Sequence, residues 1–173
     1  MKKLVALLGA ACLSLSSGLA LAADPPSDPQ IAHIAFTAGV IDIDAARLAL
    51  SKTTNDDVKA FAESMQADHQ AVNDQALALV KKLGVIPEDN ATSQALVAAS
   101  EQKRAELEKL EGAAFDRAYI ENEVAYHQQV LAALQSVLIP SARNPELKAL
   151  LETGDKLFQG HEQHAEHVAM GLK

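Results

Sequence analysis

Histidine and carboxylate side chains interrupt apolar helical patterns at several places in this sequence. Burying an imidazole or a carboxylate without a partner is costly, so each such residue needs either a hydrogen-bond partner or a metal ion. Imidazole nitrogen and carboxylate oxygen are also common ligands of divalent transition metals. The candidate metal ligands, within or beside the apolar stripe of a predicted helix, are Asp42, His69, Glu123, His127, His161 and His164.

A histidine that stands alone in an apolar stripe has two interpretations, a hydrogen-bonded core residue or a metal ligand. For His69 taken by itself, the core interpretation is the more common one. However, counting about 1.5 Å per residue from the connecting turns places His69, His127 and His161 at similar depths on three predicted helices. This shared depth favours a metal-binding role for the group. The sequence leaves open whether the layer of Asp42 and His69 meets the layer of His127 and His161.

The motifs that the sequence lacks limit its chemistry. A di-iron carboxylate bundle carries Glu-x-x-His on two helices, whereas no candidate histidine here has a glutamate three residues before it. The sequence also lacks a zinc-protease motif, a nucleophile elbow, a phosphate loop and a dinucleotide fingerprint. We therefore predict no catalytic residues and favour a binding protein over an enzyme. An oxidoreductase would require an open coordination position on the metal.

Apolar residues at alternating spacings of three and four predict the helices that must position these side chains. Asp28 and Asn144, each followed by proline, are predicted to cap the first and last helices. Thr92 or Ser93 is predicted to open a shorter helix that ends at Gly112. The predicted long helices cover about 28–52, 56–84, 115–138 (ended by Pro140) and 145–170, and the shorter, more charged helix covers about 92–110.

The lengths of the connections indicate the topology. The first and second long helices are joined by a short turn, as are the third and fourth, so each pair is expected to be antiparallel. The connection of roughly 30 residues between the second and third is long enough to cross the bundle, as in ferritin-like proteins. The predicted fold is therefore all-α, a ferritin-like four-helix bundle with an extra short crossover helix.

The first residues have the layout of a cleavable secretory signal. Lys2 and Lys3 precede an apolar run that ends before Ala20-Leu21-Ala22. Serines and a glycine interrupt this run, so it is too short for a transmembrane anchor. We predict a signal peptide over residues 1–22, a single helical domain over 23–173, and a periplasmic location. Because the single cysteine lies within the signal, the exported part has only nitrogen and oxygen ligands.

The charge balance excludes one class of partner. The chain has 15 Lys and Arg against 23 Asp and Glu, a net charge of −8. Nucleic-acid binding needs a basic stripe, so nucleic acid is not an expected partner. After the signal, no apolar run approaches the length of a membrane span. The expected partner is a metal ion, and the sequence leaves the oligomeric state open.

Three short motifs span nearly the whole chain after the signal: Asp68-His69, Phe115-Asp116-x-x-Tyr119 followed by His127, and His161-x-x-His164-Ala165. Their order and spacing resemble a family of exported bacterial proteins catalogued as domain of unknown function 4142. The resemblance implies a ferritin-like bundle and export, and it points to His69, His127 and His161 as the positions to test. The sequence departs from the family pattern at Asp42, where a longer Glu is expected, and before His161, where a proline is expected.

Two functions of different classes follow from these residues. In the first, the histidines and carboxylates hold a divalent transition metal (Zn²⁺, Cu²⁺, Ni²⁺ or Fe²⁺) for storage, buffering or stress protection, and ligand type alone does not choose among these ions. In the second, the protein is a structural or adaptor bundle whose histidines form hydrogen bonds across the core. Metal content after purification without chelators distinguishes the two.

Overall fold

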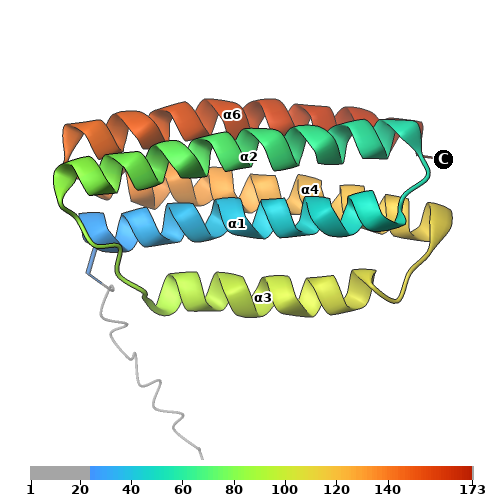
Figure 1. Cartoon of the computed structure of the whole chain (residues 1–173), viewed down its shortest axis with the longest axis horizontal. Coiled ribbons are helices and arrows are strands. Elements are labelled where there is room, and N and C mark those ends of the chain that lie inside the picture. The colour runs from blue at the N-terminus through green and yellow to red at the C-terminus, as the bar shows by residue number, and fades with distance from the viewer. Residues whose placement is uncertain (1–23, 173) are drawn as a thin grey trace, which may run out of the picture.

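The fold consists of helices and connecting loops throughout residues 24–172, the part of the chain that the computed structural model describes (Figure 1). The predicted all-α class is therefore confirmed, while the predicted signal peptide lies outside the described residues. The elements in chain order are α1 (Asp28–Lys52), α2 (Asp56–Leu83), α3 (Ala91–Leu107), α4 (Gly112–Ala133), the π-helical segment η1 (Leu134–Leu138), α5 (Ile139–Ser141) and α6 (Pro145–Gly171).

Asparagine side chains cap three of the helices. Asn55 and Asn144 accept hydrogen bonds from the free amide groups at the starts of α2 and α6. Asn90 does the same for α3, because its side-chain oxygen accepts from the backbone amides of Thr92 and Ser93. The predicted start at Thr92 or Ser93 is therefore wrong by one or two residues, since both amides already lie inside the capped first turn.

The start of α1 differs from the prediction that Asp28 is its cap. Ser27 is the N-cap, and Ser27 and Gln30 form a reciprocal capping box. The Asp28 carboxylate instead accepts hydrogen bonds from the backbone amides of Arg143 and Asn144, at 2.8 and 2.9 Å. Asp28 thus ties the beginning of α1 to the beginning of α6.

Two predicted helix ends are also corrected. Gly112 does not end the short helix: α3 stops at Leu107, and Gly112, with φ of 56°, begins α4 instead. Pro140 does not end the third long helix, because the chain passes from α4 through η1 into α5 and remains helical to Ser141. Pro140 lies in the first turn of α5, where a missing N–H costs little. Gly84, by contrast, ends α2 in the left-handed conformation, as predicted.

The four long helices lie side by side, and α3 lies along the outer side of α1 (Figure 1). The predicted antiparallel pairs are present: α1 packs closely against α2, and α4 packs against α6. Few residues of α3 are buried, namely Ser93 and Leu107. No helix among the described residues is long and apolar enough to cross a membrane.

The apolar core consists of two clusters separated by polar residues. One cluster contains Val58, Phe61, Met65, Tyr119 and Ile120 among others. The second contains the leucines of η1 and the first half of α6, with Ile31 and Ile34 of α1. Along each long helix, the buried polar residue stands next to or between the stretches that form these two clusters. A polar layer therefore crosses the middle of the bundle.

Gly39 permits a close approach between α1 and α2 beside this layer. A Cβ atom at position 39 would lie only 2.9 Å from Cγ of Asn73, which is far inside normal contact distance. Asn73 is buried. Close helix packing thus accounts for a glycine at position 39.

Candidate metal centre

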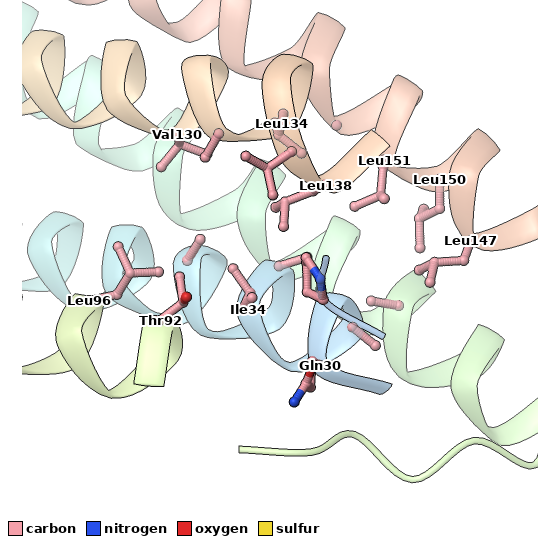
Figure 2. Close-up of a pocket in the computed structure, with 18 of the residues that line it drawn as sticks. Gln30, Ile34, Thr92, Leu96, Val130, Leu134, Leu138, Leu147, Leu150 and Leu151 are labelled. Atoms are coloured by element: carbon pink, nitrogen blue, oxygen red, sulfur yellow. The ribbon is translucent and has the colours of Figure 1, made fainter. Parts of the chain in front are cut away.

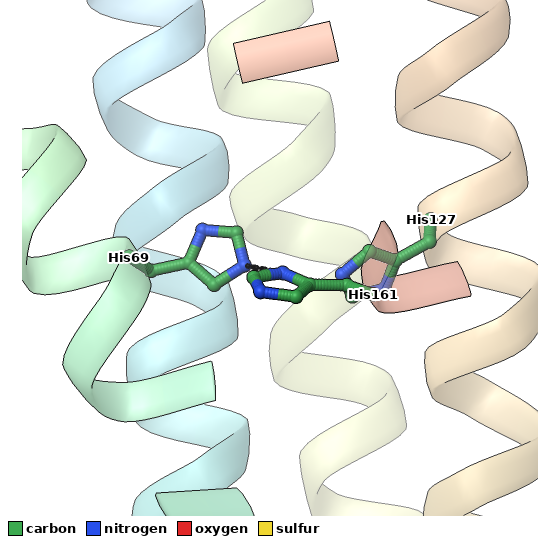
Figure 3. A group of neighbouring side chains, drawn as sticks. All are labelled: His69, His127 and His161. Atoms are coloured by element: carbon green, nitrogen blue, oxygen red, sulfur yellow. Dashed lines mark hydrogen bonds between the residues drawn. The ribbon is translucent and has the colours of Figure 1, made fainter. Parts of the chain in front are cut away.

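The polar layer brings together five of the six candidate residues. One ring nitrogen from each of His69 (α2), His127 (α4) and His161 (α6) lies within 4.8 Å of the others. Asp42 of α1 and Glu123 of α4 form a second such group with the same His127. Figure 3 shows the three imidazole rings pointing toward one another from three different helices. The two layers that the sequence left unconnected therefore meet, and His127 belongs to both groups.

All five side chains are removed from solvent. Asp42, His69, Glu123 and His127 are at most 1% exposed, and His161 is 6% exposed. The sequence placed Asp42 beside the apolar stripe of its helix, where solvent exposure was one alternative, but its carboxyl group lies in the core. The sixth candidate, His164, is not in either group. Its ring instead packs edge-on against Phe61, with 5.1 Å between centroids.

Two separations within the layer match the geometry of a coordinated ion. His161 Nδ1 lies 3.2 Å from His69 Nε2, and His69 Nε2 lies 3.4 Å from Asp42 Oδ2. Around a tetrahedral ion with bonds of about 2.1 Å, neighbouring ligand atoms are about 3.4 Å apart. Each of these two pairs is thus spaced as neighbouring ligands would be, while the two sets whose ligand atoms all lie within 4.8 Å of one another are the three histidines and Asp42 with Glu123 and His127.

Hydrogen bonds fix which nitrogen of two histidines is free to bind. His127 Nδ1 lies 2.8 Å from the backbone carbonyl of Glu123, so it carries the proton and donates it, leaving the lone pair on Nε2. His161 Nε2 donates in the same way to the Asp68 carboxylate at 3.0 Å, leaving the lone pair on Nδ1. Partners of this kind are what orient histidine ligands in metal sites.

Several buried polar atoms of the layer have no hydrogen-bond partner among residues 24–172. They are both carboxyl oxygens of Asp42, Oε2 of Glu123 and Nε2 of His127. Buried polar groups are nearly always partnered in folded proteins, and leaving one unpartnered costs about 1–3 kcal/mol. All four atoms belong to the group of Asp42, Glu123 and His127, which is one of the two that could hold a metal ion.

Burial also determines the charges in the layer. It raises the pKa of Glu123 to about 8 and raises the pKa of Asp42, to which the negative charge of Glu123 adds. Burial lowers the pKa of His69 to about 3, assisted by the neighbouring His161 and His127, and lowers that of His127 to about 4. At neutral pH the imidazoles are uncharged, and a divalent ion supplies the positive charge that would ionise both carboxyl groups.

Three further residues shape the centre. Asp68 lies about 100° around the helix from His69, a position that suits an ion pair with a neighbouring group or the orientation of one, and it accepts a hydrogen bond from His161 of α6. Phe158 packs its ring against His69 and His127, at 4.9 and 5.1 Å between centroids. The Tyr119 phenol is buried without a hydrogen-bond partner in the described range, and burial raises its pKa. Tyr119 was connected with the site only through the motifs of the resemblance, and no sequence pattern assigned a role in the site to Phe158.

A comparison with protein families identifies the family of this chain. Residues 15–168 match the family described as "Domain of unknown function (DUF4142)". The chain belongs to the DUF4142 family. The matched region includes all five residues of the polar layer, and it confirms the family resemblance noted from the three motifs.

The fold of this DUF4142 protein has a counterpart among solved structures. The crystal structure of a DUF305 fragment from Deinococcus radiodurans superposes with a TM-score of 0.72 at 19% sequence identity. The match covers 82% of this chain and 94% of that one, so the two share a fold. Among curated proteins, none matches the sequence.

Proposed function

We propose that this protein is an exported, ferritin-like bundle that binds one divalent transition metal in its polar layer, with storage, buffering or stress protection as its role. The observation that carries the proposal is the convergence of histidine and carboxylate groups from four helices, with four buried polar atoms lacking partners. The preset tautomers of His127 and His161 support it further, because each leaves a ring nitrogen unprotonated.

The geometry favours a particular ligand set. His69, His127 and His161 each offer a ring nitrogen within 4.8 Å of the others, and Asp42 Oδ2 lies 3.4 Å from His69 Nε2. Glu123 supplies a second carboxylate from the same group as Asp42. Three imidazoles with one or two carboxylates suit Zn²⁺, Cu²⁺, Ni²⁺ or Fe²⁺.

A second candidate function, a structural or adaptor bundle, is supported by the hydrogen bonds themselves. In the metal-free protein, His69 Nε2–H donates to His161 Nδ1, and His161 donates to Asp68. A layer held together in this way could fix the packing of the bundle without any ion.

Substitution of His127 separates the two functions. If it is a ligand, His127→Ala should lower the affinity for the preferred metal at least tenfold and abolish metal-induced thermal stabilisation. If it is only a core residue, the same change should lower the free energy of unfolding by roughly 1–3 kcal/mol with or without metal. The measurement is calorimetric titration with Zn²⁺, Cu²⁺, Ni²⁺ and Fe²⁺.

The matched control is His167→Ala, which removes an exposed histidine from the same protein. The control should bind metal as the wild type does. Unchanged affinity in a folded His127→Ala protein would reject His127 as a ligand. No binding of any of the four ions by the wild type would reject the metal-binding function and favour the adaptor.

Export is the remaining part of the proposal, supported by the signal-like residues before Ala23. The protein recovered from the periplasm should begin near Ala23, as measured by its intact mass. A cytosolic product that retains Met1 would contradict export.

A further inference from the structure

A partly open apolar cavity lies at one end of the bundle and extends to Phe158 beside the polar layer (Figure 2). Its volume is about 670 Å³, and small-molecule sites typically measure about 300–1,000 Å³. Leu134, Leu138, Leu147 and Leu151 line it, and each is at most 5% exposed. Other residues of the lining, such as Val137 and Asp24, are exposed, so the cavity opens to the surface at its rim. Figure 2 shows the four leucine side chains converging from η1 and α6 toward Ile34 of α1.

The lining of the cavity carries almost no charge. Among the described residues around it, Asp24 is the one charged side chain, and the polar groups are neutral amides and a hydroxyl, as in Gln30, Asn90 and Thr92. A charged ligand would lose its hydration without gaining an ion pair, which is costly. An acid would in addition be repelled by Asp24. The lining therefore favours an uncharged, apolar ligand.

Two features of the backbone leave this space open. The π-helical η1, a rare conformation often found at functional sites, contributes Leu134, Val137 and Leu138 to the wall. Gly154 is a buried residue in the middle of α6, yet a Cβ atom added there would meet nothing within 4 Å. Protein interiors are normally close-packed, so a buried helical glycine that faces open space leaves room for another molecule.

We propose that this cavity binds one small, uncharged apolar molecule with a hydrocarbon body, such as a medium-chain alcohol. The site is separate from the proposed metal centre, although Phe158 forms part of the cavity wall and also packs against His69 and His127. Binding of the apolar molecule requires no ion, so its failure and the failure of metal binding are observed in different titrations.

The test is a fluorescence titration of the purified protein with the neutral probe N-phenyl-1-naphthylamine, followed by competition with 1-dodecanol or dodecanoate. The probe should bind at one site per chain, and 1-dodecanol should displace it at least tenfold more effectively than the anionic dodecanoate. Gly154→Leu, which fills the open space, should weaken probe binding at least tenfold. The matched control is Gly160→Leu, an exposed glycine of the same helix with equally open surroundings, which should bind as the wild type does.

A second measurement locates the ligand without relying on a substitution. In methyl NMR spectra, 1-dodecanol should shift the signals of Leu134, Leu138, Leu147 and Leu151, and leave those of the exposed Leu77 unchanged. Absence of probe binding by the wild type would overturn the proposal. Undiminished binding by a folded Gly154→Leu protein, dodecanoate binding better than 1-dodecanol, or shifts confined to surface methyl groups would also overturn it.

Discussion

Asp68 is about half exposed, yet its carboxylate determines which nitrogen of a buried histidine faces the polar layer. Its hydrogen bond holds the proton of His161 on Nε2 and keeps Nδ1 free. Removal of such a partner typically lowers metal affinity about 10- to 100-fold. Asp68→Ala should therefore weaken metal binding by that factor in a calorimetric titration and change the unfolding midpoint little without metal.

The control for Asp68→Ala is Asp74→Ala on the same helix, where the carboxylate bonds only to the exposed Gln70. Metal affinity in the control should equal that of the wild type. Equal affinities in all three proteins would show that Asp68 does not position a ligand.

The raised pKa values of Asp42 and Glu123 predict that metal binding releases protons. The pKa of Glu123 is about 8 because the carboxyl group is buried, and coordination requires the ionised form. Metal affinity should therefore increase as the pH rises from about 6.5 to 8.5. His69 and His127, with pKa values of about 3 and 4, are already neutral there and contribute no dependence. Calorimetry in buffers of different ionisation enthalpy counts the released protons, and none released would contradict the assignment.

The free energy of unfolding of the metal-free protein should fall as the pH rises, whereas the metal affinity should increase. A carboxyl group whose pKa is higher in the folded state than in the unfolded state makes its full contribution to stability below the pKa of the unfolded state. That pKa is 4.5 for Glu123. That contribution is lost as the pH rises through about 8. With a chelator present, the free energy of unfolding should fall between about pH 6.5 and 8.5 in urea titrations. Glu123→Gln, which stays neutral, should show a smaller loss, because only Asp42, whose pKa burial also raises, still titrates in the layer.

At the scale of the helices, the contact between Gly39 and Asn73 sets how closely α1 approaches α2. Overpacking a tight core contact costs typically about 1–3 kcal/mol, so Gly39→Ala should lower the free energy of unfolding by about that amount. Gly160→Ala, made at an exposed and unobstructed helical position, should instead be neutral or stabilise the protein by up to about 1 kcal/mol. Equal effects of the two substitutions in urea unfolding would contradict the packing explanation.

The helices themselves could be predicted because their limits depend on local chemistry. Asn55, Asn144 and Gly84 act on the backbone groups nearest to them, and the apolar stripes extend over many turns. The roles predicted for Asp28 and Pro140 were wrong because they depend on other parts of the structure. The Asp28 carboxylate accepts hydrogen bonds from the loop before α6, and Pro140 lies at the start of α5, directly after η1.

The candidate site was only partly predictable for the same reason. Residue types and depths indicated His69, His127 and His161, but their meeting depends on how the α1–α2 pair packs against the α4–α6 pair. That packing arises from tertiary contacts, as do the bond from Asp68 to His161 and the apolar cavity, and a single sequence does not reveal them.

At the scale of the whole molecule, a metal ion bound at the proposed centre would link the helices that carry its ligands. At a free metal concentration about 100 times the dissociation constant, binding adds about 2.7 kcal/mol of stability. For a domain of this size that corresponds to an increase in Tm of about 6–10 °C. Calorimetric scans with the preferred ion and with a chelator measure the difference, and Mg²⁺, which prefers oxygen ligands, should give no increase. An equal increase with Mg²⁺ would indicate binding at surface carboxylates.

The polar layer has a further consequence for the alignment of the bundle. Hydrophobic burial is not directional, so the two apolar clusters specify the axial position of a helix mainly through the fit of their side chains. Each long helix, however, contributes at least one polar side chain to the same level, from Asp42 on α1 to His161 on α6. A slip of one turn moves a helix by about 5.4 Å, which would bury its polar group among leucines and put an apolar group among the imidazoles. The polar layer therefore specifies a single alignment of the four long helices along their axes.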